Sequence, residues 1–321
     1  MTSSDLLAPT TTQTVPRLIA LDWGTSSLRA YLLGDEGTVV DDITVPWGIM
    51  ATPDGDFARA LESVTGTWTN RWPGLPMIAA GMIGSAQGWQ EIPYLGCPTG
   101  LDDLVAAVRA QPAVPGTSLK IVPGVALDGD IPDVMRGEET QVVGALALDS
   151  GLSQRSLLIM PGTHSKWVAV RDGRIVTFTT YLTGELFAVL SQHSILGRPA
   201  MAVAKESKPL VPAWTAFDRG VRTVRGNPGR PLSSLLFSTR TLVLSGRLTA
   251  SESLDYLSGL LIGEELRSAL SQTADGFACA LIGESGLCQR YRRALDLFGV
   301  DHAQIIAGAS PAGLWRIALQ L

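Results

Sequence analysis

The chain has 321 residues, which is enough for one large domain or two ordinary domains. Hydrophobic residues make up 45% of it and charged residues 17%, so the chain can bury a sizeable core. The net charge of −5 and the lack of a long basic run argue against nucleic acid as the main partner. No apolar run approaches the ~20 residues of a membrane helix, so we expect no membrane partner and a soluble, cytoplasmic protein.

The start of the chain and its cysteines carry no targeting or metal signal. Residues 1–16 are rich in Ser, Thr and Pro and lack the basic start and apolar centre of a signal peptide, so we expect a flexible tail. Cys97, Cys279 and Cys288 have no CxxC spacing and are odd in number, which favours free thiols in a reducing compartment. The three histidines are scattered and show no zinc-binding spacing.

The stretch 18–33, LIALDWGTSSLRAYLL, predicts a hairpin that turns at Gly24 and Thr25 between two apolar runs. Gly24 has no Cβ, so the backbone can approach a ligand closely there. Thr25, Ser26 and Ser27 add hydroxyls and free N–H groups, which suit a bound anion. Asp22 at the strand end is a hard oxygen ligand, suited to Mg²⁺ or its water shell. The stretch therefore predicts a turn for the phosphates of a nucleotide with its magnesium.

The rest of the first half predicts alternating strands and helices. The expected elements are a strand within 39–50, a helix over 56–68, a buried strand over 76–84, a short helix over 101–111, a strand over 119–127 and an amphipathic helix within 136–149. The intervening segment 85–100 is rich in Gly, Pro and aromatic residues, and is either structural filler or a ligand-binding loop. Its Trp89 and Tyr94 are either core residues or a platform for a sugar.

Residues 157–170, LLIMPGTHSKWVAV, repeat the first hairpin, with Gly162 and Thr163 at the turn. An Asp-x-Gly-Thr turn also occurs in ordinary hairpins, but two copies in one chain favour a phosphate-binding pair. The second copy has Met160 in the place of the aspartate, so only one metal-facing carboxylate is present. It has Lys166 instead, a point charge for phosphate or a solvated side chain. Two such turns that face each other would hold a triphosphate from both sides.

The second half also alternates. The expected elements are a helix over 183–196, a long helix ending near Leu270, a strand over 277–285, a helix after it and a closing strand, turn and helix. For the basic segment 205–231, rich in Pro and Gly, we favour a surface insertion over a mobile flap. The alternation predicts α/β layering, and the repeat predicts two lobes with a cleft between them. We expect lobes at 17–152 and 153–321, and the last helix could pack back on the N-terminal lobe.

Five segments carry a resemblance to a known family: LDWGTSSLRAYL, AAGMIGSAQGWQEIPYL, VPGVA with DVMRGEETQVVGAL, IMPGTHSKWV and LIGESGLCQRY. With them the chain resembles the 2-keto-3-deoxygalactonokinases of the actin–hexokinase–Hsp70 ATPase superfamily. The resemblance covers the chain from Leu18 onward. It implies a two-lobed, ribonuclease H-like fold with a central cleft, and ATP and Mg²⁺ as cofactors. The implied reaction phosphorylates the terminal 6-hydroxyl of 2-keto-3-deoxygalactonate to 2-keto-3-deoxy-6-phosphogalactonate, in galactonate catabolism.

The resemblance also implies the site residues by position. Those implied for catalysis are Glu139, Glu138 and Asp22, and Asp22 is also the implied metal ligand. Those implied for nucleotide and phosphate are Gly24, Thr25, Ser26, Gly162, Thr163, His164, Ser165, Lys166, Gly283, Glu284 and Ser285. Those implied for the sugar acid are Gly81, Met82, Gln87, Trp89, Tyr94 and Arg136.

The base is less clear than the other roles, because the superfamily's sugar kinases have an aspartate where this chain has two glutamates. Glu138 and Glu139 cannot both face the cleft, since neighbours on a helix diverge. We favour Glu139, because a threonine follows it as in hexokinases. Arg136 either pairs locally or holds the substrate carboxylate with its planar fork.

Other functions stay open at this stage. The chain could be a kinase of another small sugar acid, or an actin-like or chaperone-like ATPase with a binding role. At 321 residues it leaves little room for the extra subdomain that the latter would need. The sequence does not separate galactonate-type from gluconate-type epimers, and it is compatible with a monomer or a homodimer.

Overall fold

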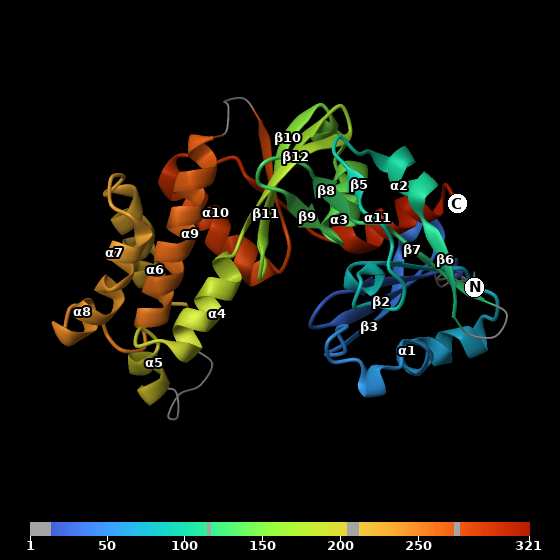
Figure 1. The fold of residues 1–321 in the computed structure, drawn as a ribbon, viewed down its shortest axis with the longest axis horizontal. Helices are drawn as coiled ribbons and strands as arrows, with labels where there is room; N and C mark the ends of the chain where they lie inside the picture. The colour runs from blue at the N-terminus through green and yellow to red at the C-terminus, as the bar shows by residue number, and fades with distance from the viewer. Residues whose placement is uncertain (1–13, 114–116, 204–211, 273–276) are drawn as a thin grey trace, which may run out of the picture.

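We describe residues 14–113, 117–203, 212–272 and 277–321 in a computed structural model. Two sheets form the framework of the two lobes (Figure 1). In the order in which they pair, the strands of the first sheet are β3 (Val39–Val45), β2 (Leu28–Leu33), β1 (Leu18–Trp23), β4 (Met77–Ala80), β7 (Ser118–Ile121) and β6 (Arg109–Pro112). Those of the second are β12 (Arg174–Tyr181), β11 (Ser165–Arg171), β10 (Arg155–Met160), β13 (Ala278–Ile282) and β14 (Gln304–Ile306).

The two sheets repeat one plan. In each, an antiparallel hairpin extends into a third antiparallel strand, and parallel strands follow on the other side of the first strand. Asp22 pairs with Arg29 across the first hairpin, and Met160 pairs with Lys166 across the second. The two turns identified in the sequence therefore occupy equivalent places in equivalent sheets, at the ends of β1 and β10. A small third sheet consists of β5 (Leu95–Gly96), β8 (Val125–Leu127) and β9 (Asp133–Met135).

Helices cover both faces of each sheet. α3 (Glu138–Leu148) and α11 (Ala309–Ala318) pack on each other and share one core with the inner faces of both sheets. α1 (Phe57–Arg71) covers the far face of the first sheet, and α9 (Ser253–Ser271) and α10 (Ser285–Phe298) cover the far face of the second. α11 also packs directly against β1 and β4. The last helix of the sequence thus lies between the two sheets, beside α3 (Figure 1).

The remaining helices are short or lie at the outer side of the second lobe (Figure 1). They are α2 (Leu101–Ala107), α4 (Thr183–His193), α5 (Arg198–Val203), α6 (Trp214–Arg225), α7 (Leu232–Leu236) and α8 (Ser238–Leu244). Single 3-10 turns stand at η1 (Asp35–Gly37), η2 (Pro53–Gly55), η3 (Met82–Gly84) and η4 (Ser150–Ser153).

Two expected elements of the first half differ in the structure. The helix expected over 101–111 ends at Ala107, and β6 follows it at the edge of the first sheet. The strand expected over 119–127 is two strands, β7 and β8, which belong to different sheets. Pro123 and Gly124 lie at the break, and proline has no N–H to donate to a strand ladder. The apolar residues on both sides of Pro123 and Gly124 concealed this change of sheet.

The surface insertion expected over 205–231 is wrong for α6, whereas residues 204–211 lie outside the described part of the chain. Phe217, Val221 and Val224 are fully buried, and α6 packs along α9. Their spacing of four and three residues is that of one helical face. The arginines between them have partners elsewhere: Arg219 donates to Arg247 O, and Arg222 pairs with Asp218 on the same helix.

Candidate active site

A cleft of about 630 Å³ lies where the carboxyl ends of β1 and β10 and the amino end of α3 meet. Many of the predicted site residues line it. They are Asp22, Gly24, Thr25, Ser26, Gly81, Met82, Tyr94, Arg136, Glu138, Gly162, Thr163, His164, Lys166, Gly283 and Glu284. The turns identified in the two hairpins therefore open into the same cavity, on either side of the start of α3.

The first turn has main-chain donors to spare. Among the described residues, the N–H groups of Thr25 and Ser26 have no hydrogen-bond partner. Gly48 packs directly beneath them, and its backbone leaves no room for a side chain. The turn is thus held from below while its donors stay available, which is the arrangement of a backbone anion site.

Asp22 stands beside this turn and receives help from the far end of the sequence. The Ser310 hydroxyl at the start of α11 donates to Asp22 Oδ2 at 2.9 Å, and the Arg29 guanidinium lies 4.0 Å from the same oxygen. Burial raises the pKa of Asp22, and the Ser310 hydrogen bond and the Arg29 charge oppose that rise. A divalent cation would remove the cost of a buried carboxylate here.

The second turn is built in the same way. Among the described residues, the N–H groups of Gly162 and Thr163 have no hydrogen-bond partner. Gly184 at the start of α4 packs against this turn as closely as Gly48 packs against the first. His164 Nε2 lies 2.6 Å from Glu185 Oε2, so its imidazole is already engaged at the rim of the cleft.

Ser165 does not line the cleft, contrary to its predicted place among the phosphate ligands. It is fully buried, and its hydroxyl lies 2.8 Å from that of Tyr291. The Tyr291 hydroxyl donates to Glu265 Oε2 at 2.6 Å, and the Trp167 indole donates to Glu265 Oε1 at 2.7 Å. This buried chain anchors the second turn to α9 and α10.

Tyr291→Phe is therefore expected to lower the free energy of unfolding by about 1–3 kcal/mol, because buried groups of Ser165 and Glu265 lose a partner. Denaturant titration measures this loss. Tyr181→Phe is the matched control, since the Tyr181 hydroxyl is only partly buried and its contact with Ser268 is 3.3 Å long. Equal losses in the two variants would contradict an anchoring role for the buried chain.

The two glutamates at the start of α3 point in different directions. Glu138 lines the cleft, and its Oε2 accepts the Arg136 N–H at 3.0 Å. Glu139 is completely buried, accepts the Gly137 N–H at 2.7 Å and accepts the Thr140 hydroxyl at 2.9 Å. The preference for Glu139 as the cleft-facing acid is wrong in its register. Successive side chains leave a helix about 100° apart, and the motif alone did not fix which one points inward.

The electrostatic surroundings of the two acids differ as well. Burial raises the pKa of Glu138, whereas the charge of Lys166 lowers it. Burial and the charge of Glu138 raise the pKa of Glu139 to about 8, although hydrogen bonds from Gly137 and Thr140 oppose the rise. Glu139 is therefore largely protonated at neutral pH, while Glu138 has a cation close by that supports its charged form.

Lys166 is a fixed part of the cleft wall, not a solvated side chain. It is 5% exposed, and its Nζ donates to Val134 O at 3.1 Å and to Thr180 Oγ1 at 2.8 Å. Thr180 in turn donates its hydroxyl to Asp133 at 2.6 Å, so β9 and β12 are tied together beside the ammonium group. An ammonium has three donors, so one remains for a ligand.

Arg136 has donors that the protein does not use. Its guanidinium carbon lies 4.1 Å from the centre of the Tyr94 ring, and Nη2 donates to Ile92 O at 2.7 Å. Its Nε and Nη1 atoms are buried and have no hydrogen-bond partner among the described residues. A buried unpaired donor on a charged group is costly, so this guanidinium is suited to an anionic ligand.

Other predicted residues lie elsewhere. Gln87 and Trp89 do not line the cleft: Gln87 is exposed, and the Trp89 ring stacks on Phe57 with centroids 6.3 Å apart. Glu284 reaches the cleft, but its carboxylate caps α10 and accepts the N–H groups of Gly286 and Leu287 at 2.8 Å. These hydrogen bonds lower the pKa of Glu284. Ser285 lines no part of the cleft.

The structure adds cleft residues that the sequence reasoning did not single out as ligands. They are Arg29, Asp133, Gln141 and Thr180. Arg29 lies in the segment LDWGTSSLRAYL and Asp133 lies in DVMRGEETQVVGAL. Both segments carry the family resemblance, so the sequence did indicate that these two residues could lie at the site. Ser310 bonds Asp22 from the other end of the chain, and no local pattern reveals such a contact.

A magnesium ion fits this donor set only with help from a ligand. The described residues contain no group of three or more His, Cys, Asp or Glu side chains that could hold a metal alone. Mg²⁺ commonly takes one or two protein carboxylates and completes its shell with water and phosphate oxygens. One carboxylate beside two phosphate-type turns meets that requirement.

Comparison with known proteins identifies the family. The model of the family described as 2-keto-3-deoxy-galactonokinase matches residues 22–317. The chain belongs to this family. It is 38% identical over 284 residues to a "Probable 2-dehydro-3-deoxygalactonokinase" of Rhizobium meliloti (strain 1021), a match that covers 88% of this chain and 90% of the relative. It is 35% identical to the 2-dehydro-3-deoxygalactonokinase of Escherichia coli (strain K12), covering 94% of this chain and 97% of that enzyme.

Solved structures agree with this membership of the 2-keto-3-deoxy-galactonokinase family. A crystal structure from Sinorhizobium meliloti, of a "putative 2-dehydro-3-deoxygalactonokinase protein", superposes with a TM-score of 0.83 at 36% identity, covering 94% of this chain and 98% of that one. An activator of 2-hydroxyisocaproyl-CoA dehydratase from Clostridium difficile shares the fold, with a TM-score of 0.51 at 12% identity and coverage of 94% and 95%. The two-lobed actin/hexokinase-like fold is thereby confirmed. Among the described residues, no helix is long and apolar enough to cross a membrane.

Proposed function

We propose that this protein is an ATP-dependent kinase that phosphorylates the terminal 6-hydroxyl of 2-keto-3-deoxygalactonate, giving 2-keto-3-deoxy-6-phosphogalactonate in galactonate catabolism. Family membership supports the reaction, and the names of the relatives support the substrate. The observation that carries the proposal is one cleft that combines two phosphate-type turns, the carboxylate of Glu138 and the guanidinium of Arg136, whose Nε and Nη1 have no partner among the described residues.

The nucleotide side is assigned to the two turns. The free N–H groups of Thr25, Ser26, Gly162 and Thr163 would hold the β- and γ-phosphates from opposite sides. A second, mostly apolar pocket of about 160 Å³ adjoins the second turn, and Gly162 lines both cavities. Its walls come from the starts of α4 and α10 and from α9, with Phe187, Leu261 and Leu287 among them. This pocket is our candidate for the adenine base.

Asp22 would orient Mg²⁺. When it is bound, this cation neutralises negative charge on the phosphates. The Ser310 hydroxyl fixes one carboxylate oxygen of Asp22, so the other oxygen keeps a defined direction. Arg29 at 4.0 Å adds positive charge on the same side. Phosphoryl transfer requires positioning and charge neutralisation more than covalent chemistry, and this set provides both.

The sugar-acid side is assigned to Arg136, with Gly81, Met82 and Tyr94 around it. Tyr94 covers one face of the guanidinium and Ile92 O accepts from Nη2, so the Nε and Nη1 donors are those left for a carboxylate. Glu138 stands two residues further along, and would accept the proton of the hydroxyl as the bond to phosphorus forms. Burial raises the pKa of Glu138, and the nearby charge of Lys166 opposes that rise, which supports the charged form that a base needs.

Arg136→Lys is expected to raise the KM for the sugar acid by ~10-fold or more, while the KM for ATP changes little. Lysine keeps the charge but loses the planar fork that matches a carboxylate. Steady-state kinetics with each substrate varied in turn measures the two effects. An increase confined to the KM for ATP would move Arg136 to the nucleotide side, and the carboxylate ligand would have to be another residue.

An assay of ADP release across 2-keto-3-deoxy sugar acids tests the proposed function. We expect turnover with 2-keto-3-deoxygalactonate and a lower kcat/KM with its gluconate epimer. ATP hydrolysis should be slow without a sugar acid, because phosphoryl transfer awaits the acceptor hydroxyl. Rapid turnover of ATP that no sugar acid alters would favour an ATPase with a binding role, and preference for another sugar acid would replace the substrate.

A further inference from the structure

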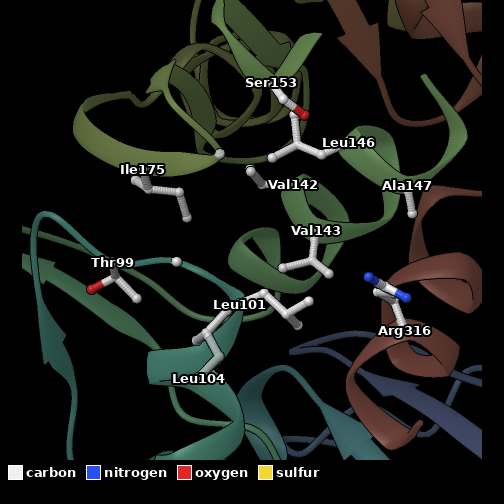
Figure 2. Close-up of a pocket in the computed structure, with 12 residues that line it drawn as sticks. Thr99, Leu101, Leu104, Val142, Val143, Leu146, Ala147, Ser153, Ile175 and Arg316 are labelled. Atoms are coloured by element: carbon white, nitrogen blue, oxygen red, sulfur yellow. The ribbon is translucent and has the colours of Figure 1, made fainter. Parts of the chain in front are cut away.

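A cavity separate from the active site lies beside the second half of α3 (Figure 2). Its volume is about 400 Å³, within the usual range of small-molecule sites. The walls come from α2, from α3, and from the start of β12 with the turn before it. Arg316 in the last turn of α11 completes them. None of the residues that line it also lines the cleft. Neither the phosphate turns nor the sugar-acid residues account for this cavity.

The interior of the cavity is apolar. Leu104, Val142, Val143 and Ile175 form its walls and are buried, and Leu146 adds a further branched side chain. In Figure 2 these side chains point toward a common space between the three elements that carry them. Such a surface favours a compact hydrocarbon body, because water gains little there from hydrogen bonding.

One cation stands at the edge of this apolar space. The Arg316 guanidinium points toward Val143 and Ala147 in Figure 2, and no hydrogen bond or ion pair joins it to another described residue. Among the described residues that line the cavity none is acidic, so the charge offered to a ligand by the lining is the positive charge of Arg316, at one end of an apolar cavity.

We propose that this cavity binds a small amphipathic monocarboxylate, with its hydrocarbon body against α2 and α3 and its carboxylate on Arg316. Charge complementarity selects the carboxylate, and the planar fork of arginine can accept it with two parallel hydrogen bonds. A sugar acid is a poor occupant, because its hydroxyls would lose water without finding polar partners on the apolar walls. The site is thus chemically distinct from the cleft that contains Arg136.

Isothermal titration of the full chain with octanoate tests the proposal, in the presence of a saturating concentration of 2-keto-3-deoxygalactonate. We expect one octanoate per chain, and at least tenfold weaker binding in Arg316→Gln. Arg292→Gln is the matched control, because Arg292 is an exposed arginine on α10 that lies outside this cavity. It should bind octanoate like the unaltered protein.

A blocking variant and an uncharged probe complete the test. Ala147 is exposed at the cavity mouth, so Ala147→Phe should fill the entrance, leave the melting temperature nearly unchanged and abolish octanoate binding. Octanamide, which has the same chain without the charge, should bind at least tenfold more weakly than octanoate. The proposal is overturned if octanoate does not bind at millimolar concentration, if Arg316→Gln binds it equally well, or if a second titration shows that octanoate binds only when the sugar acid is left out. The last outcome would place octanoate on Arg136 and leave the proposed kinase function intact.

Discussion

Glu138→Gln is expected to lower kcat by ~10²–10⁴-fold with little change in the KM of either substrate. Glutamine has nearly the same shape and can still accept the Arg136 N–H, but it cannot take a proton from the sugar hydroxyl. Glu138 lines the cleft, and Lys166 supports its charged form. A loss confined to kcat is the result of removing a contact that matters only in the transition state. Pre-steady-state measurement of phosphoryl transfer would separate this step from product release.

Glu139→Gln is the matched comparison, because it makes the same chemical change one residue further along the helix. Glu139 is fully buried and largely neutral, so its amide replacement should retain most of the activity. If Glu139→Gln is the inactive variant and Glu138→Gln is active, the base is Glu139 and the direction of the side chains in the cleft does not decide the chemistry. If both variants are active, neither residue is the base.

Glu139→Gln is also expected to change how the stability of the protein depends on pH. The pKa of Glu139 is raised to about 8 in the folded protein, above its value in an unfolded chain. Below the unfolded pKa of about 4.5 the carboxyl is protonated in both the folded and the unfolded chain and does not lower the free energy of unfolding. As pH rises toward 8, the carboxyl ionises in the unfolded chain but not in the folded protein, so the free energy of unfolding falls. Glu139→Gln cannot ionise, so its unfolding free energy should fall less than that of the unaltered protein between pH 5 and pH 8. Denaturant titrations at both pH values measure the difference.

Asp22→Asn should leave the fold intact and reduce turnover by ~10²-fold or more. The amide oxygen can still accept the Ser310 hydroxyl, but the charge that orients magnesium is gone. Kinetics at rising Mg²⁺ concentrations should show a higher requirement for the metal. Asp35→Asn is a suitable control, because Asp35 is an exposed carboxylate that pairs with Arg17. Near-normal activity of Asp22→Asn would remove Asp22 from the mechanism.

Local patterns were sufficient to predict the framework of the site. Each hairpin is a continuous stretch of sequence, so the turns at Gly24 and Gly162 and the strands around them followed from apolar runs and turn residues. The repeat then predicted two lobes with a cleft between them. The pairing of Asp22 with Arg29 and of Met160 with Lys166 shows how closely the two hairpins correspond.

Choices between neighbouring residues were beyond such patterns. Whether Glu138 or Glu139 faces the cleft depends on a rotation of about 100° around α3, which is set by packing against α11. Ser165 is the first residue of β11, and its buried side chain contacts Tyr291 and does not line the cleft. Trp89 belongs to a loop of the right composition, but Phe57 on a distant helix offers it an apolar partner. Contacts between segments far apart in sequence decided all three.

The hydrogen bond between Asp22 and Ser310 also bears on how the chain is made. These residues are separated by 288 positions, and α11 covers the inner face of the sheet that contains β1. On the ribosome, Leu18, Ala20 and Ile78 emerge long before Leu314 and Ile317, which share their core in the finished molecule. The first sheet must therefore wait for most of the chain before its inner face is covered. A half-length fragment would expose that face and tend to aggregate, so the N-terminal half is unsuited to separate expression.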